Sequence, residues 1–155
     1  MIIREEVKFI VPYSLPCVMG NEFSGIVDKV GSDVTEFKIG DRVYGRTPLN
    51  KIGAFAEYIA IDKEAIAIIP NYLSFKEAAC IPLTALTAMQ AFELMEAQSG
   101  ERIFISGGTG SFGAMAIPIA KSLGYRISTS GSGSNRERVM KLGADEFFVS
   151  KSRLF

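Results

Sequence analysis

Short apolar runs and longer patterns with helical spacing alternate along the second half of the chain. Runs at Ile103–Ile105, Tyr125–Ser130 and Phe147–Val149 have the length of buried strands. An apolar helical pattern extends from about Gly110 to Leu123, and a second helix is expected after the polar loop that follows Ser130. This order predicts a β-α-β-α-β unit built on a parallel sheet.

The first seventy residues have a different pattern, in which short alternating or β-branched runs are separated by glycine-containing turns. Closely spaced strands of this kind are typical of a small barrel or sandwich. The expected strands are Val7–Val11, Phe23–Val30, Arg42–Tyr44, Ala54–Ile61 and Ala65–Ile69.

Two helices are predicted between these halves. Ser74 and Glu77 have the spacing of a capping box, which predicts a short helix from Ser74 to about Cys80. A second helix is expected from Thr84 to about Ala97, because this stretch is rich in Ala, Leu, Met and Glu and contains no Gly or Pro.

The turn after Ile103–Ile105 contains the spacing Gly108-x-Gly110-x-x-Gly113. A diphosphate lying against backbone N–H groups at a helix N-terminus needs positions without bulky side chains. Gly108 is expected to permit the turn, Gly110 the close approach of the ligand, and Gly113 the packing of helix on strand. The same spacing also occurs for geometric reasons alone, but the β-α-β-α-β context favours a dinucleotide site.

The end of the second predicted strand indicates which dinucleotide is bound. An NAD site places an acid about 20 residues after the glycine motif, whereas residues 128–136 contain none. Ser130 and Arg136 suit a 2′-phosphate, through a hydroxyl donor and a charge-assisted guanidinium fork, so NADP(H) is predicted. Arg138 is the alternative cation. The competing interpretation is a solvated loop in which Arg136 is an ordinary surface charge.

Composition excludes several chemistries. The 155 residues are 48% hydrophobic, carry no formal net charge and include no histidine, so Ser-His and Cys-His catalysis are excluded within this chain. Cys17 and Cys80 provide neither a disulfide framework nor a four-thiolate zinc site. Nucleic-acid binding is not expected without a basic cluster, and no apolar stretch reaches the roughly 18 residues of a membrane span. Without a recognisable signal peptide, a cytoplasmic location is expected.

Six motifs follow one another along the chain: Gly20–Val27, Val30–Gly31, Phe37–Gly45, Gly53–Tyr58, Ala78–Ala88 and Lys141–Asp145. Together they resemble the medium-chain dehydrogenase/reductase superfamily, in particular its zinc-independent quinone oxidoreductase-like branch. In zinc-dependent relatives a histidine precedes the glutamate of the first motif, and here that position is Asn21. The resemblance covers residues from about 7 to 149.

This resemblance implies an α/β chain, with a partial GroES-like β-barrel in residues 1–72. The first β-α-β-α-β half of a Rossmann NADP-binding domain, preceded by linking helices, is implied in residues 73–155. It further implies NADPH-dependent reduction of quinones, or of alkenes conjugated to a carbonyl, by hydride transfer without a metal. No catalytic residue can be named.

By the same resemblance, Thr87 is expected near the nicotinamide or the diphosphate. The alternative for Thr87 is a helical hydroxyl that bonds back to its own turn. The residues implied on the diphosphate are Gly107, Gly108, Thr109, Gly110, Ser111, Phe112 and Gly113, and those implied at the 2′-phosphate end are Ser130, Gly131 and Arg136.

Members of this family are about twice as long as this chain. We therefore expect a barrel without its first strands and a sheet that stops after three, with an exposed edge and apolar faces. A homodimer formed across such an edge is the expected remedy. Loss of activity is the expected consequence, so the alternative function is a non-catalytic NADP-binding or oligomerisation module.

Overall fold

The computed structural model describes residues 16–150. They fall into two compact units that divide between Pro82 and Leu83, and each unit is described by itself. The strand predicted at Val7–Val11 lies outside the described residues. The domain boundary at residue 72 remains a prediction.

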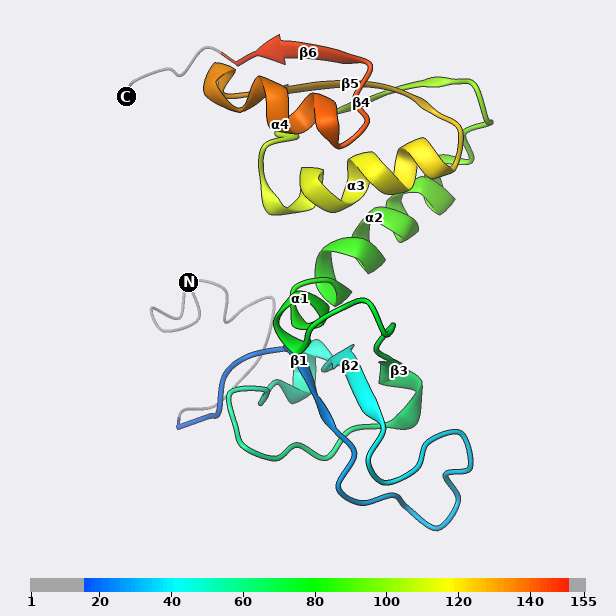
Figure 1. Cartoon of the computed structure of the whole chain (residues 1–155), viewed down its shortest axis with the longest axis vertical. Coiled ribbons are helices and arrows are strands. Elements are labelled where there is room, and N and C mark those ends of the chain that lie inside the picture. The colour runs from blue at the N-terminus through cyan, green and yellow to red at the C-terminus, as the bar shows by residue number, and fades with distance from the viewer. Residues whose placement is uncertain (1–15, 151–155) are drawn as a thin grey trace. The chain divides into compact units, whose positions relative to one another are not determined.

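An antiparallel three-stranded sheet organises the N-terminal unit (Figure 1). Strand β2 (Arg42–Arg46) lies between β1 (Glu22–Ile26) and β3 (Ile66–Ile68). Two 3-10 turns, Leu49–Lys51 and Lys63–Ala65, occur in the segment between β2 and β3.

Helix α1 (Phe75–Ala79) follows this sheet and begins as the sequence predicts. The Ser74 hydroxyl accepts a hydrogen bond from the Glu77 N–H, and the Glu77 carboxylate accepts one from the Ser74 N–H at 2.9 Å. Ser24 Oγ also donates to the Phe75 carbonyl at 2.7 Å, which ties α1 to β1.

The strand predicted at Ala54–Ile61 is wrong, and no closed barrel forms among residues 16–82. The N–H groups of Ala54 and Phe55 donate to the carbonyls of Gly20 and Met19 at 2.9 and 2.8 Å, and the rest of the predicted strand is irregular. An alternating strand needs a neighbouring strand on which to pair, and among the described residues no such pairing continues beyond Phe55. The result is an open sheet of three short strands.

The C-terminal unit has the predicted β-α-β-α-β order. Strands β4 (Arg102–Ile105), β5 (Arg126–Gly131) and β6 (Glu146–Val149) form a parallel sheet in that order, with Ile103 opposite Ile127 and Ser128 opposite Glu146. The helices are α2 (Pro82–Met95), α3 (Ser111–Ser122) and α4 (Arg136–Lys141), and a 3-10 turn at Gly133–Asn135 precedes α4. Helix α2 starts two residues before the predicted Thr84, since proline is well suited to the first position of a helix.

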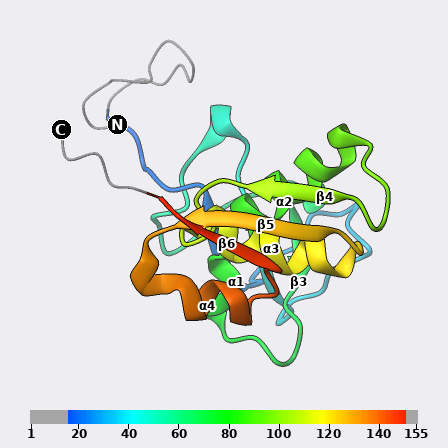
Figure 2. The ribbon, with the colours of Figure 1, turned by 90° about the horizontal axis from the view of Figure 1, so that it is seen from above.

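Helices α3 and α4 lie on the same face of this sheet (Figures 1 and 2). Ile103, Ile127 and Phe147 point toward them and are buried in one apolar core with Ile117 of α3 and Val139 of α4. The opposite face carries Phe104 and Phe148, which are 59% and 54% exposed and whose ring centroids are 6.5 Å apart. We call this surface the bare face of the sheet.

Asp145, the residue before β6, links α3 and β5 through hydrogen bonds of its side chain. Its carboxylate accepts a hydrogen bond from Lys121 Nζ at 2.6 Å and another from the Ile127 N–H at 2.7 Å. The Lys121 bond, followed by the Ile127 bond, lowers the pKa of Asp145 from its ordinary value of 3.8.

Replacing Asp145 with asparagine is expected to destabilise the protein by about 1 kcal/mol at pH 7. Because the folded-state pKa is the lower one, the ionised carboxylate contributes full stability above pH 3.8. This contribution is lost as the pH falls toward the lower folded-state value. Urea unfolding of both proteins at pH 7 and pH 3 measures this: the difference in their free energies of unfolding should shrink at pH 3.

The control is the exposed pair Lys141–Glu137, in which the change Glu137→Gln should cost no more than about 0.5 kcal/mol. A difference for Asp145→Asn that is the same at both pH values contradicts the assignment.

Candidate functional site

The loop between β4 and α3 turns at Gly107. This residue has a φ of +71°, in the left-handed region that favours glycine, and its carbonyl accepts a hydrogen bond from the Gly110 N–H at 2.9 Å. The turn was expected at Gly108, which does not have a positive φ. Gly108 instead donates its N–H to the Ser130 carbonyl at 2.8 Å, which fixes the loop on the end of β5.

Gly108 and Gly113 touch each other across the loop. A Cβ atom on Gly113 would lie 2.4 Å from Gly108 Cα and 2.6 Å from its carbonyl carbon and oxygen. These are backbone atoms that cannot move aside independently. The start of α3 therefore approaches the loop as closely as it does only because position 113 has no side chain. This contact is with the loop, whereas the packing predicted for Gly113 is of helix on strand.

Two threonine–glycine contacts attach the loop to β5. A Cβ on Gly108 would lie 2.2 Å from Thr129 Oγ1, and a Cβ on Gly131 would lie 2.4 Å from Thr109 Cγ2. Thr129 is fully buried, and its hydroxyl donates to the Ile105 carbonyl at 2.6 Å. Sequence reasoning missed Thr129, and its only signal was a polar residue inside an apolar strand.

Helix α3 begins at the loop with Gly110 as its N-cap and with no side-chain cap. Its first intrahelical bond runs from the Ala114 N–H to the Gly110 carbonyl at 3.0 Å. The N–H groups of Ser111, Phe112 and Gly113 precede that bond and have no acceptor within the helix, as in the first turn of any helix. Ser111 and Phe112 are exposed, and Gly110 leaves room beside them, because a Cβ there would come no closer than 3.4 Å to a neighbouring atom.

Ser130 and Arg136 lie on either side of the loop that ends β5. Ser130 Oγ accepts a hydrogen bond from the Gly107 N–H at 3.4 Å, so this side chain adjoins the glycine turn. The exposed Arg136 guanidinium carbon lies 5.9 Å from the centroid of the Phe147 ring. Arg138 is also exposed. The structure thus shows the glycine loop and Ser130 in contact, and it gives no contact between Ser130 and Arg136.

Thr87 lies on α2, where it is exposed and its hydroxyl donates to the Leu83 carbonyl at 2.6 Å. This is the back-bonding geometry that the alternative interpretation of Thr87 predicts. A role for Thr87 beside a nicotinamide remains a prediction.

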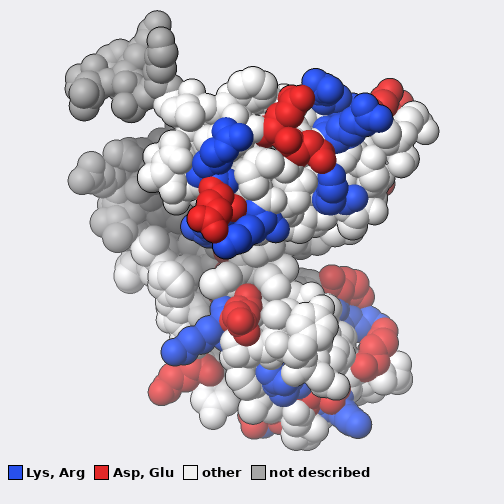
Figure 3. Space-filling view, turned by 45° about the horizontal axis from the view of Figure 1, so that its top comes forward, with Lys and Arg blue, Asp and Glu red and all other residues white. Residues whose placement is uncertain are grey.

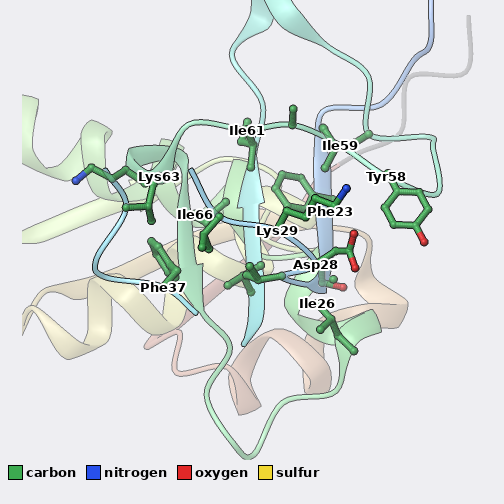
Figure 4. Close-up of a pocket in the computed structure, with 18 of the residues that line it drawn as sticks. Phe23, Ile26, Asp28, Lys29, Phe37, Tyr58, Ile59, Ile61, Lys63 and Ile66 are labelled. Carbon is green, nitrogen blue, oxygen red and sulfur yellow. The ribbon is translucent and has the colours of Figure 1, made fainter. Parts of the chain in front are cut away.

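The N-terminal unit contains a hollow of about 780 Å³, separate from the glycine loop and formed by residues between Phe23 and Ile66. Figure 4 shows Phe23, Phe37, Ile61 and Ile66 around it, with Lys63 and Tyr58 extending outward at its margins. Lys63 pairs with Glu36, and this bond lowers the pKa of Glu36 to about 2. The lining is mixed, since it also includes the charged residues Asp28, Lys29 and Glu57.

Residues 16–150 include no group of three Cys, Asp or Glu side chains arranged to hold a metal ion. None of the helices between residues 16 and 150 combines the length and the apolar composition of a membrane span. Positive and negative side chains are interspersed on the face presented in Figure 3, without a continuous basic surface.

A parallel β-α-β-α-β sheet with this glycine loop at its first turn defines a Rossmann-type nucleotide-binding fold. The family model of the alcohol dehydrogenase GroES-like domain matches residues 2–71. The chain belongs to the medium-chain dehydrogenase/reductase superfamily.

Known proteins with oxidoreductase names are similar to both units. The chain is 37% identical to 2-methylene-furan-3-one reductase of Solanum lycopersicum over 139 residues, which cover 84% of this chain and 36% of the relative. It is 33% identical to the chloroplastic NADPH-dependent alkenal/one oxidoreductase of Arabidopsis thaliana, with the same coverage of both. The Escherichia coli quinone oxidoreductase complexed with NADPH superposes with a TM-score of 0.80 at 31% identity, over 93% of this chain and 44% of that one. The chain thus spans less than half the length of these relatives.

Proposed function

We propose that this chain binds NADP(H) and belongs to a zinc-independent reductase of quinones, or of alkenes conjugated to a carbonyl. The observation that carries the proposal is the close packing of the glycine loop, in which Gly108 and Gly113 lack the side chains that would separate the start of α3 from the end of β5. The alkenal/one oxidoreductase and the quinone oxidoreductase above are both named with NADPH, which supports the choice of cofactor.

The residues of the loop fit a diphosphate. Ser111, Phe112 and Gly113 present the N–H groups of the first turn of α3, at the positive end of the helix dipole. Gly107 and Gly110 leave the approach open, since a Cβ on Gly107 would meet nothing within 4 Å. The loop thus offers fixed donors to an anion without a side chain in the way.

The end of β5 and the start of α4 fit a ribose with a 2′-phosphate better than a ribose with free hydroxyls. Ser130 supplies a hydroxyl next to the loop, and Arg136 supplies an exposed guanidinium with room for a bidentate ion pair. No acid lies between Ser128 and Arg136 to repel the phosphate or to bind the ribose hydroxyls.

When bound, NADPH supplies the hydride that reduces the substrate. The contribution of this chain is to hold the adenosine and diphosphate parts so that the cofactor is positioned. Asn21 stands where zinc-dependent relatives have a histidine, and the sequence contains no histidine, so the reaction proposed here uses no zinc.

Replacing Arg136 with alanine is expected to weaken NADPH binding about 10- to 100-fold and to leave NADH binding nearly unchanged, because only NADPH carries the phosphate that the guanidinium pairs with. Calorimetric titration of the wild type and the variant with each dinucleotide measures this. Arg138→Ala is the matched control and should alter NADPH binding less than 3-fold. If Arg136→Ala weakens the binding of NADPH and NADH equally, or weakens neither, Arg136 does not bind the 2′-phosphate.

A non-catalytic NADP-binding module is the second candidate. It is favoured because the glycine loop, Ser130 and Arg136 all lie within the C-terminal unit. NADPH oxidation that depends on an added quinone or enone supports the reductase, and NADPH binding without turnover supports the module.

We also propose that the protein forms a homodimer through the C-terminal unit, with the bare face of the sheet as its interface in place of the strand edge expected from the sequence. Parallel sheets are normally covered on both faces, whereas Phe104 and Phe148 leave the bare face largely exposed. Association of two such faces would remove these rings from water.

A further inference from the structure

The contact between Thr109 and Gly131 leaves no room for a side chain at the end of β5. Gly131 is buried, and its φ lies outside the left-handed region, so its backbone would accept any residue. Space alone excludes a side chain, because a Cβ at position 131 would lie 2.4 Å from Thr109 Cγ2, 3.0 Å from its Oγ1 and 3.2 Å from its Cβ.

Rotation of Thr109 relieves this conflict only in part. A different rotamer moves the methyl and hydroxyl groups of the side chain, but the Thr109 Cβ stays 3.2 Å from the new atom, which is still a tight contact. The backbone of the loop is also held, since Gly108 N–H donates to the Ser130 carbonyl at 2.8 Å and Gly110 N–H to the Gly107 carbonyl at 2.9 Å. Thr109 therefore crowds position 131 in each of its rotamers.

Position 131 is chemically important because it ends the second strand of the β-α-β-α-β unit, about 20 residues after the glycine motif. In this fold, an acid there binds both ribose hydroxyls of NAD, and its negative charge would repel a 2′-phosphate. A protein without a side chain at position 131 therefore has no carboxylate there to repel the 2′-phosphate.

We propose that Thr109 is a positioning residue for the choice of cofactor: it crowds position 131, so that a side chain there, and with it a ribose-binding acid, is disfavoured and the site stays suited to NADPH. This inference rests on the proposed NADP(H) site and adds a specificity-determining residue to it. Thr109 acts through packing, so its effect appears in folding as well as in binding.

The test compares Gly131→Asp with the double variant Thr109→Gly/Gly131→Asp. Thermal unfolding and calorimetric titrations with NADPH, NADH and adenosine 2′,5′-bisphosphate are measured for each. Gly133→Asp is the matched control, since a Cβ at Gly133 would lie 3.6 Å from Val149 in ordinary contact. It adds an acid to the same loop without displacing Thr109.

Gly131→Asp alone is expected to lower the unfolding temperature by several degrees and to bind neither dinucleotide well. The double variant should recover at least half of the lost unfolding temperature and bind NADH at least 10-fold more tightly than NADPH. Gly133→Asp should unfold close to the wild-type temperature.

Two results would overturn the inference. One is a Gly131→Asp variant that is as stable as the wild type and binds NADH as well as the double variant does. The other is a double variant that still prefers NADPH. If the wild type binds neither NADPH nor adenosine 2′,5′-bisphosphate, the proposed function fails, and the inference about Thr109 fails with it. Either of the first two results, in contrast, contradicts only the inference about Thr109, because the wild type still binds NADPH.

Discussion

Replacing Gly113 with alanine is expected to destabilise the C-terminal unit by about 3 kcal/mol, the upper range for inserting one carbon into a packed site. The new methyl group would lie 2.4 Å from Gly108 Cα, so either α3 or the glycine loop must move. Gly108 is tied to Ser130 by its N–H, and movement of the loop would also break that bond. Urea unfolding followed by circular dichroism measures the loss.

Gly110→Ala is the matched control for this change. It alters the same motif, but its methyl group would approach no closer than 3.4 Å to the Gly107 carbonyl. We expect a change in the free energy of unfolding of about 0.5 kcal/mol or less, together with weaker NADPH binding because the methyl group lies where the diphosphate approaches. If the two variants are equally stable, the close contact of Gly113 with Gly108 does not hold the unit together.

The double change Phe104→Ser/Phe148→Ser is expected to convert a dimeric protein to a monomer. Both rings are more than half exposed, so the substitutions should cost the isolated unit little while removing most of the apolar area of the bare face. Sedimentation velocity at increasing protein concentration measures the shift for both proteins.

Leu86→Ser serves as the control for the dimer, since Leu86 on α2 is also about half exposed and lies off the sheet. It should leave the sedimentation coefficient unchanged. A wild-type protein that stays monomeric at tens of micromolar contradicts the dimer, and a double variant that still associates places the interface elsewhere.

The β-α-β-α-β unit could be predicted from sequence because its signals are local. The spacing of apolar residues distinguishes the runs at Ile103–Ile105 and Phe147–Val149 from the helical pattern after Gly110, and each element satisfies its own periodicity. Ser74 and Glu77 likewise contain within four residues all that a capping box requires.

The N-terminal unit could not be predicted to the same degree. Whether Ala54–Ile61 becomes a strand depends on a neighbour on which to pair, and alternation within the segment does not supply that information. The turn of the glycine loop was also misplaced by one residue, because the glycine spacing assigns it to Gly108 whereas Gly107 has the positive φ. The contacts of Thr109 with Gly131 and of Gly108 with Thr129 join residues about 20 apart, and their distance emerges only once loop and strand are placed together.

The hydrogen bond from the Gly108 N–H to the Ser130 carbonyl holds the glycine loop in one position before a ligand binds. Gly108 also packs against Gly113 of α3 and Thr129 of β5, so the loop is attached to both of these elements. Opening of the loop would then break the hydrogen bond to Ser130 and separate Gly108 from Gly113 and Thr129. An anion arriving at α3 meets donors that are already in place, and its affinity is not reduced by the entropy of ordering a flexible segment.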